Sequence, residues 1–388
     1  MKKTYLWAMA LVASALTLSA CSSDDKNEPI TPPSQDNNQN NDPDQEDSFN
    51  IEFSTKNATS WCNYMTQVAS LLEADAATLY NNWEISFENG KAYKDYFKGL
   101  DNKEALEQIL EGCCDIAGEV GDAKIGDPYH LYIQGKTTEA LYAVESWYSW
   151  HSRDDYKNNI ISVRNSYFGS RDENIAEASM AELIRKANPE LDQEVKDAIQ
   201  AAYDAIDAIP QPFRNNINSR EAQDAMEACG ELNEILAKTS SFIDQTDLNE
   251  SAMEAVVKNY VDNVVMPTYA ELKQNNKALA DAVKAFAANP SNALFEKACE
   301  AWLTARMPWE TSEAFLFGPV DELGLDPNMD SWPLDQDAIV NILNSGKYEN
   351  LNWNDGDDDD AIEAAQSVRG FHTLEFLLFK DGKARTIH

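Results

Sequence analysis

A histidine and a glutamate three residues apart near the C-terminus are the best-defined candidates for chemistry in this sequence. They are His372 and Glu375, within Gly-Phe-His-Thr-Leu-Glu. Residues three apart on a helix share one face, about 5–6 Å from each other, so this imidazole and carboxylate could reach one cation. The apolar neighbours Phe371, Leu374 and Leu377 predict that the helix is buried and shielded from water. The alternative is an ordinary surface or capping pair.

Other residues of the kinds that carry chemistry narrow the choice of site. The chain has only four histidines, which excludes a His-rich metal centre: His130, His151, His372 and His388. It contains no His-Glu-x-x-His motif, no Gly-rich phosphate loop and no Gly-x-Ser-x-Gly elbow. The run Asp357 to Asp360 lacks the spaced ligands of a calcium loop and predicts a solvated loop. One imidazole with two or more carboxylates is a ligand set that suits iron, manganese or zinc rather than copper.

A second stripe of polar and aromatic residues recurs at threes and fours before the motif: Trp302, Arg306, Trp309 and Glu313. One interpretation is a core helix in which Glu310 or Glu313 neutralises Arg306. In the other interpretation, Glu313 supplies a third ligand, a carboxylate oxygen, near His372.

The elements that must position these residues are helices. Apolar residues recur at threes and fours through 180–209 and 256–286, whereas alternating strand patterns are scarce. Asn188-Pro189 predicts that a new helix begins at Glu190, and Pro267 interrupts the second run. The sequence therefore predicts an all-α fold of two helical-bundle domains with a pocket at their interface.

Breaks between the helices are marked by polar, glycine-rich or proline-rich stretches. Three such regions are predicted to separate helices: 118–135, 318–333 and 352–360. Thr, Ser, Asp and Asn cluster between Ser240 and Glu250, which predicts domains of residues 49–245 and 246–388.

The N-terminus resembles a bacterial lipoprotein leader. Lys2 and Lys3 precede an apolar run too short to cross a bilayer, and Leu-Ser-Ala-Cys resembles a lipobox that implies lipidation of Cys21. Residues 22–48 are rich in Asp, Asn, Gln and Pro and predict a solvated tether. These features predict an outer-membrane lipoprotein, on the periplasmic or the surface face, that contacts the membrane through its lipid only.

The charge of the chain excludes some partners. It is −36, or −38 without the two lysines of the leader, so nucleic acid and anionic membrane surfaces are poor partners and cations are plausible ones. Besides Cys21, five irregularly spaced cysteines remain, which is not a disulfide framework. We expect them to be buried as small apolar residues, although a single disulfide is the alternative.

Taken with its flanks, the motif resembles the imelysin family, also called the M75 peptidase-like or iron-regulated family. The family hallmark Gly-x-His-x-x-Glu is met by Gly370, His372 and Glu375. The segment Ala301 to Gly318 and the later Trp332-Pro333 resemble the flanking blocks. Earlier in the chain, a further family block is resembled by residues 145–149, 154–155, 158–160 and 167–169. The two halves stand in the reverse of the usual family order, which predicts a circular permutation.

The resemblance implies two helical domains with the motif facing a pocket, and a link to bacterial iron uptake. It makes His372 and Glu375 metal-site candidates, with Glu313 added from the flank. The pocket residues predicted with them are Gly370, Arg306, Trp309, Glu145, Ser146 and Asp155.

The leading hypothesis is a protein that binds iron or an iron-containing ligand, with zinc as the alternative metal. Other iron-uptake proteins of the envelope are its expected partners. A metallopeptidase with Glu375 or Glu313 as general base is the second. A surface glycan-binding or adhesion module that uses aromatic residues is the third, with Trp147, Tyr148, Trp150 and Tyr156 as candidates, although burial in helices explains most of them.

Overall fold

The computed structural model describes residues 51–87, 90–348, 351–353 and 358–387. The predicted leader, Cys21 and the tether lie outside this part of the chain. Within it, almost every element is a helix, so the predicted all-α fold is confirmed. The described strands are β1 (Phe379–Lys380) and β2 (Lys383–Ala384), an antiparallel pair with Phe379 opposite Ala384.

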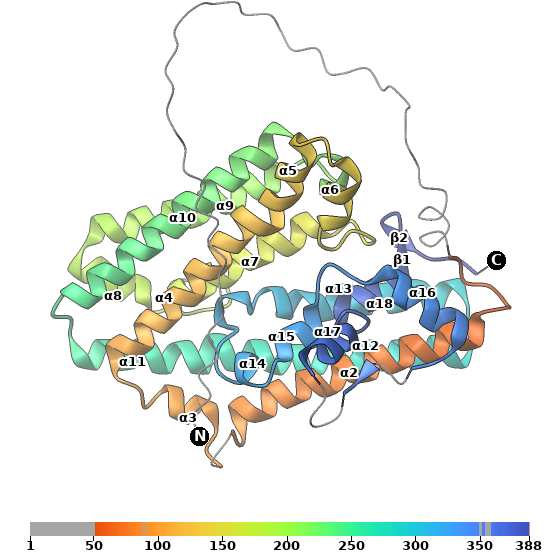
Figure 1. The fold of residues 1–388 in the computed structure, drawn as a ribbon. Coiled ribbons are helices and arrows are strands. Elements are labelled where there is room, and N and C mark those ends of the chain that lie inside the picture. The colour runs from red at the N-terminus through yellow and green to blue at the C-terminus, as the bar shows by residue number, and fades with distance from the viewer. Residues whose placement is uncertain (1–50, 88–89, 349–350, 354–357, 388) are drawn as a thin grey trace, which may run out of the picture. The chain divides into compact units, whose positions relative to one another are not determined.

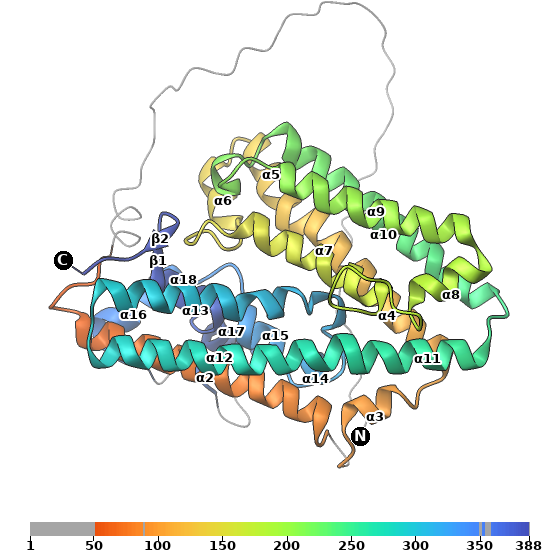
Figure 2. The same ribbon diagram turned by 180° about the vertical axis from the view of Figure 1, so that it is seen from behind.

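The helices follow one another with short connections (Figures 1 and 2). The first half contains α2 (Ala58–Glu84), α3 (Tyr93–Phe97), α4 (Asn102–Glu119), η1 (Val120–Ile125), α5 (Gly126–Ile133), α6 (Thr137–Ala143), α7 (Ser152–Phe168), α8 (Met180–Ala187), α9 (Pro189–Ala208), η2 (Phe213–Asn215) and α10 (Arg220–Gln245). The second half contains α11 (Glu250–Tyr260), η3 (Val261–Val265), α12 (Met266–Ala288), α13 (Asn292–Glu310), η4 (Glu313–Phe315), α14 (Pro319–Glu322), α15 (Leu325–Asp330), α16 (Gln336–Ser345), α17 (Asp359–Gln366) and α18 (Gly370–Leu378).

Two groups of helices pack against each other in Figure 1. In one, α12 packs on α2 and α13, and α18 packs on α13 and α2. In the other, α10 packs on α4 and α9, and α7 packs on α9 and α4. Helix α13 and η4 contact α7, and the buried apolar residues of both groups form one continuous core.

The grouping of the helices crosses the predicted division at residue 245. Helix α2 precedes the division, yet it packs with α12 and α18, which follow it. Amphipathic periodicity shows that a helix has an apolar face but does not show which other helix covers that face. The two domains with that boundary therefore stay a prediction, while α10 ends and α11 begins where the sequence placed the connection.

The prediction that residues 118–135 separate two helices is wrong, because α4, η1 and α5 run on as one helix with a π-helical turn at Val120–Ile125. The glycines serve close packing here. A Cβ at Gly118 would lie 2.9 Å from Nδ2 of Asn233, and one at Gly121 would lie 3.0 Å from Cβ of Cys229. Both neighbours belong to α10, so the missing side chains let α10 approach. A similar turn, η3, carries the helix past Pro267.

Other local predictions are confirmed. Helix α9 begins at Pro189, one residue before the predicted start, and the Asn188 side chain accepts a hydrogen bond from the backbone N–H of Leu191 at 3.2 Å. The five described cysteines form no disulfide with one another, and all but Cys114 are buried. Among the described residues, no helix combines the length and apolar character that crossing a membrane requires.

Candidate metal site

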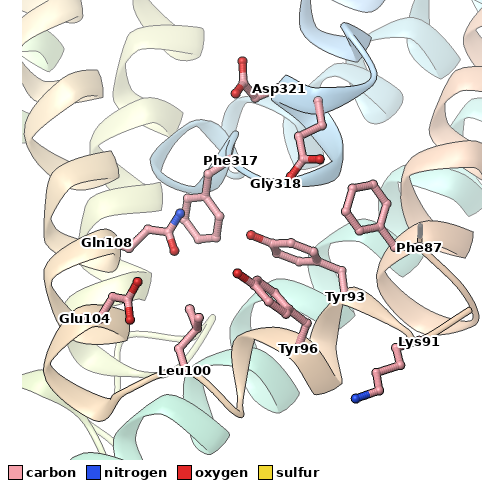
Figure 3. Close-up of a pocket in the computed structure, with 11 residues that line it drawn as sticks. Phe87, Lys91, Tyr93, Tyr96, Leu100, Glu104, Gln108, Phe317, Gly318 and Asp321 are labelled. Carbon is pink, nitrogen blue, oxygen red and sulfur yellow. The ribbon is translucent and has the colours of Figure 1, made fainter. Parts of the chain in front are cut away.

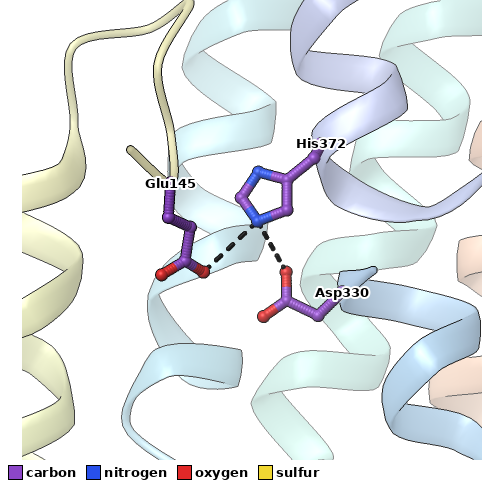
Figure 4. A group of neighbouring side chains, drawn as sticks. All are labelled: Glu145, Asp330 and His372. Carbon is purple, nitrogen blue, oxygen red and sulfur yellow. Dashed lines mark hydrogen bonds and ion pairs between the residues drawn. The ribbon is translucent and has the colours of Figure 1, made fainter. Parts of the chain in front are cut away.

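His372 lies at the start of α18 and is completely buried. Gly370 precedes it with a backbone φ of +87°, which lets the chain turn sharply into the helix. Figure 4 shows the imidazole pointing at two carboxylates from other segments. Nε2 lies 3.1 Å from Oδ1 of Asp330 and 3.3 Å from Oε1 of Glu145.

The three residues of this cluster come from distant parts of the chain. Glu145 lies in the turn before α7, Asp330 ends α15, and His372 starts α18. Each offers one ligand atom, and the three atoms lie within 4.8 Å of one another. The arrangement brings together one imidazole nitrogen and two carboxylates, a set that fits Fe²⁺, Mn²⁺ or Zn²⁺.

Glu375 holds the other side of the His372 ring. Its Oε2 lies 3.0 Å from Nδ1, and its Oε1 accepts hydrogen bonds from the backbone N–H groups of Tyr148 at 3.0 Å and Ser149 at 2.7 Å. The Ser149 hydroxyl donates a further bond at 2.7 Å. This geometry makes Glu375 the group that orients the imidazole, whereas the sequence-based prediction made it a second ligand.

Arg306 lies in the middle of the carboxylates and is fully buried. Its guanidinium contacts Glu145 at 2.7 Å, Glu310 at 2.6 Å, Asp155 at 3.6 Å, and Asp330. The contact shows that Glu310, one of the two partners suggested by the sequence, pairs with Arg306. The guanidinium also touches the same oxygens of Glu145 and Asp330 that face His372, so a bound cation must share or displace these contacts.

Positive charges keep the carboxylates of Glu145 and Asp330 ionised. Burial alone would raise the pKa of Glu145, but Lys124, the hydrogen bond with His372 and Arg306 together lower that pKa to about 2. Lys124 sits in the π-helical turn η1, with Nζ 3.0 Å from Oε2 of Glu145. Burial likewise opposes ionisation of Asp330, and Arg306 and His372 outweigh it, so the pKa of Asp330 is lowered.

His372 and Glu310 are shifted in the opposite direction. Burial and the Arg306 charge lower the pKa of His372, but Asp330 and the hydrogen bonds to Asp330 and Glu145 outweigh them, and the pKa is raised well above its usual value. Burial raises the pKa of Glu310 to about 8 despite the adjacent Arg306. The cluster therefore holds ionised carboxylates beside a carboxyl group that binds a proton readily.

Glu313 belongs to a second group of carboxylates with Glu310 and Asp330, whose ligand atoms also lie within 4.8 Å of one another. Asp330 is common to both groups. Glu313 lies next to the His372 cluster through Asp330, and burial raises its pKa well above the usual value. Oε1 of Glu310 and Nε of Arg306 are buried and form no hydrogen bond among the described residues, although each lies in an ion pair, with Arg306 at 2.6 Å and with Asp155 at 3.6 Å.

A pocket of about 450 Å³ leads to this cluster from the surface. Its lining includes Glu145, Asp330, Glu313, Lys124 and Trp332. The Trp332 ring meets His372 edge-on, with 4.8 Å between the ring centroids, and its Nε1 donates to the Ala143 carbonyl at 3.1 Å. Trp332 therefore covers the imidazole, while Glu145 and Asp330 line the pocket.

The other predicted pocket residues lie beside the cluster. Trp309 donates a hydrogen bond from Nε1 to Oδ2 of Asp330 at 2.6 Å. Ser146 donates to Oδ2 of Asp155, and its φ of +51° marks a tight turn. Oδ1 of Asp155 in turn lies 2.8 Å from Nδ1 of His151.

The pair of His151 and Asp155 predicts a pH-dependent contribution to stability. Burial lowers the pKa of His151, but Asp155, Asp154 and Glu310 outweigh it and raise that pKa. A raised folded-state pKa stabilises the fold below the unfolded pKa of about 6.5 and loses that effect as the pH rises through the folded value. His151→Gln should lower the free energy of unfolding by about 1 kcal/mol at pH 6 and by less at pH 9.

Urea unfolding followed by circular dichroism at the two pH values measures the difference. His130→Gln, at an exposed position on α5, is the matched control and should change little at either pH. A His151→Gln effect that is equal at pH 6 and pH 9 would contradict the electrostatic origin.

Three residues of the cluster were not predicted as site residues: Asp330, Lys124 and Glu310. Asp330 stands two residues before Trp332-Pro333, which resembles a flanking block of the imelysin family, so the signal for Asp330 was a carboxylate beside that block. Lys124 lies in a stretch that the sequence suggested was irregular. Glu310 was considered only as a partner of Arg306.

Comparisons with known proteins agree with this architecture. The family model described as imelysin matches residues 34–239 and 265–388. A crystal structure of an imelysin peptidase from Bacteroides ovatus is 55% identical, covers 88% of this chain and 100% of its own, and superposes with a TM-score of 0.87. The iron-regulated protein A of Synechococcus elongatus is 32% identical over 123 residues.

The match to the Synechococcus protein is partial: it spans 32% of this chain and 31% of that protein. The predicted interchange of the two halves stays a prediction. The family model, by contrast, covers most of the sequence, including the segments that carry Glu145, Asp330 and His372. The chain therefore belongs to the imelysin family.

Proposed function

We propose that this protein binds iron, or an iron-containing ligand, through Glu145, Asp330 and His372. The observation that carries the proposal is a buried imidazole nitrogen that faces two carboxylates from separate segments at 3.1 and 3.3 Å. The name of the Synechococcus relative, iron-regulated protein A, supports iron over other metals of similar ligand preference.

Each residue has a defined part in this proposal. Glu145, Asp330 and His372 supply ligand atoms, and Glu375 fixes the ring so that Nε2 points at the carboxylates. Lys124 and Arg306 keep the carboxylates ionised before the cation arrives. A proton on Nε2 and the guanidinium of Arg306 both compete with the metal, which favours reversible binding over permanent retention.

The proposed setting is the cell envelope. The predicted lipid on Cys21 would hold the protein at the outer membrane, and residues 22–48 would separate the helical part from it. The acidic chain would concentrate cations near the pocket. Delivery to or from other iron-uptake proteins of the envelope is part of the proposal.

Isothermal titration of the purified protein with Fe²⁺ under anaerobic conditions, and separately with Zn²⁺, tests the site. We expect saturable Fe²⁺ binding that weakens at least about tenfold in His372→Gln and in Asp330→Asn, since each variant loses one ligand. In the control His130→Gln, glutamine replaces an exposed histidine, and we expect this variant to bind Fe²⁺ like the wild type.

Unchanged Fe²⁺ affinity in His372→Gln would contradict the site. Binding of Zn²⁺ but not Fe²⁺, lost in the same variants, would keep the site and reject iron. The peptidase alternative predicts chelator-sensitive cleavage of an unfolded protein that stops in Glu375→Gln. Both oxygens of Glu375 are already engaged by His372, Tyr148 and Ser149, so the geometry favours binding.

A further inference from the structure

A second pocket, of about 490 Å³, lies away from the His372 cluster, between α3, the start of α4 and the segment 317–322. Figure 3 shows its lining, in which four aromatic rings stand near carboxylates at the rim. The aromatic residues are Phe87, Tyr93, Tyr96 and Phe317, and the carboxylates are Glu104, Asp321 and Glu322. Its volume is in the range of small-molecule sites.

The rings of this pocket form a corner and not a flat platform. The centroids of Tyr93 and Tyr96 are 5.4 Å apart with an angle of 40° between the rings, and those of Tyr93 and Phe87 are 5.4 Å apart with an angle of 86°. Rings at such different angles can surround a compact group from several sides. A sugar ring, by contrast, stacks best on one flat aromatic face.

Gly318 lets the corner form. A Cβ at this position would lie 2.2 Å from Cζ and 2.5 Å from the hydroxyl oxygen of Tyr93. The backbone of Gly318 has a φ of +62°, which side chains other than glycine rarely adopt. The close approach of chain and ring is therefore built into the wall of the pocket.

Tyr93 lies in the wall of this space. Its side chain is deeply buried, with only 4% of the residue exposed, and it lines the pocket. Figure 3 shows the hydroxyls of Tyr93 and Tyr96 pointing the same way, toward Gln108. Both hydroxyls can hydrogen-bond to a ligand in the pocket.

The charge of the lining selects the ligand. Three carboxylates and one lysine, Lys91, give it a formal charge of −2. Figure 3 shows the Lys91 amine directed away from the two tyrosine hydroxyls. Aromatic faces attract cations through their negative π surfaces, and carboxylates at the rim add to that attraction.

We propose that this pocket binds an organic ammonium cation, with the charged group held against Tyr93 and Tyr96 and facing Asp321 and Glu104. The proposal is independent of the metal site, because none of the pocket residues belongs to either carboxylate group near His372. The protein would then carry two sites of different chemistry, one for a metal and one for an amine.

Titration calorimetry with choline and with n-butylammonium tests the pocket, and 3,3-dimethylbutanol serves as the uncharged isostere of choline. We expect at least one of the two cations to bind about tenfold or more tightly than the isostere. Tyr96→Ala and Asp321→Asn should each weaken that binding about fivefold or more. Both positions are exposed, so neither change should disturb the fold.

Tyr132→Ala, on α5 and outside the pocket, is the matched control and should bind the cation like the wild type. Circular dichroism melting checks that all variants are folded. Equal binding of choline and its isostere would overturn the proposal, as would unchanged affinity in Tyr96→Ala. Absence of saturable binding of either cation below about 10 mM, or binding of methyl glucoside in their place, would overturn it too.

Discussion

Arg306→Met should lower the free energy of unfolding by about 3–5 kcal/mol at neutral pH. Arg306 is fully buried and its guanidinium contacts four carboxylates, among them Glu145 at 2.7 Å and Glu310 at 2.6 Å. Methionine fills a similar volume but carries no charge, so the carboxylates would remain buried without this counter-ion. Urea unfolding followed by circular dichroism measures the loss.

The loss should shrink as the pH falls. Arg306 helps to depress the pKa values of Glu145 and Asp330 in the folded protein. Depressed carboxylates stabilise the fold above their unfolded pKa of about 4, and that stability is lost as the pH falls toward the folded value. The variant lacks this contribution, so the difference between wild type and variant should begin to shrink near pH 5 and continue to shrink down to about pH 2, the folded pKa of Glu145.

The control for this substitution is Arg220→Met. The Arg220 side chain is 79% exposed and pairs with Asp224 on the surface of α10, so its loss should change the stability little. Adding Zn²⁺ should raise the melting temperature of Arg306→Met more than that of the wild type, because the cation replaces the missing charge. Equal stability of the Arg306 and Arg220 variants would contradict the role given to Arg306.

Gly370→Ala should destabilise the fold by about 2–4 kcal/mol and weaken metal binding at least tenfold. The added Cβ would lie 2.6 Å from the carbonyl oxygen of Met329 and 2.9 Å from its carbonyl carbon. These are backbone atoms, which cannot rotate away as a side chain can. Relief of the clash would have to move either His372, on the helix that Gly370 starts, or Asp330, which follows Met329.

Gly135→Ala separates the effect of the clash with Met329 from the effect of the left-handed backbone. Gly135 also has a positive φ, of +83°, but a Cβ there would meet no atom within 4 Å. Its substitution should cost only the strain of the left-handed backbone, about 1–2 kcal/mol, and should leave metal affinity unchanged. Titration of both variants with Fe²⁺ decides the point, and wild-type affinity in Gly370→Ala would refute the coupling between this glycine and the site.

Much of the helical architecture followed from local patterns. The apolar periodicity indicated the long helices, and Asn188-Pro189 indicated the start of α9. The glycines of 118–135 were misread because glycine carries two signals: it permits turns, and it permits close helix packing. Only the position of α10 shows that Gly118 and Gly121 serve the second purpose.

The candidate site divides in a similar way. The sequence by itself determined that His372 and Glu375 share one helix, since their contact is three residues apart and follows from helix geometry. It also determined that Glu310, four residues after Arg306, could pair with it. Both are contacts within a single helix, where spacing along the chain fixes distance in space.

Only the tertiary structure decided which groups face Nε2 of His372. Glu145 is separated from it by 227 residues, and Asp330 belongs to a third segment. Spacing along the chain says nothing about such pairs, because their distance depends on how the helices pack. That packing turned Glu375 into the group that orients the ring and placed Glu145 and Asp330 where the sequence had suggested Glu375 and Glu313.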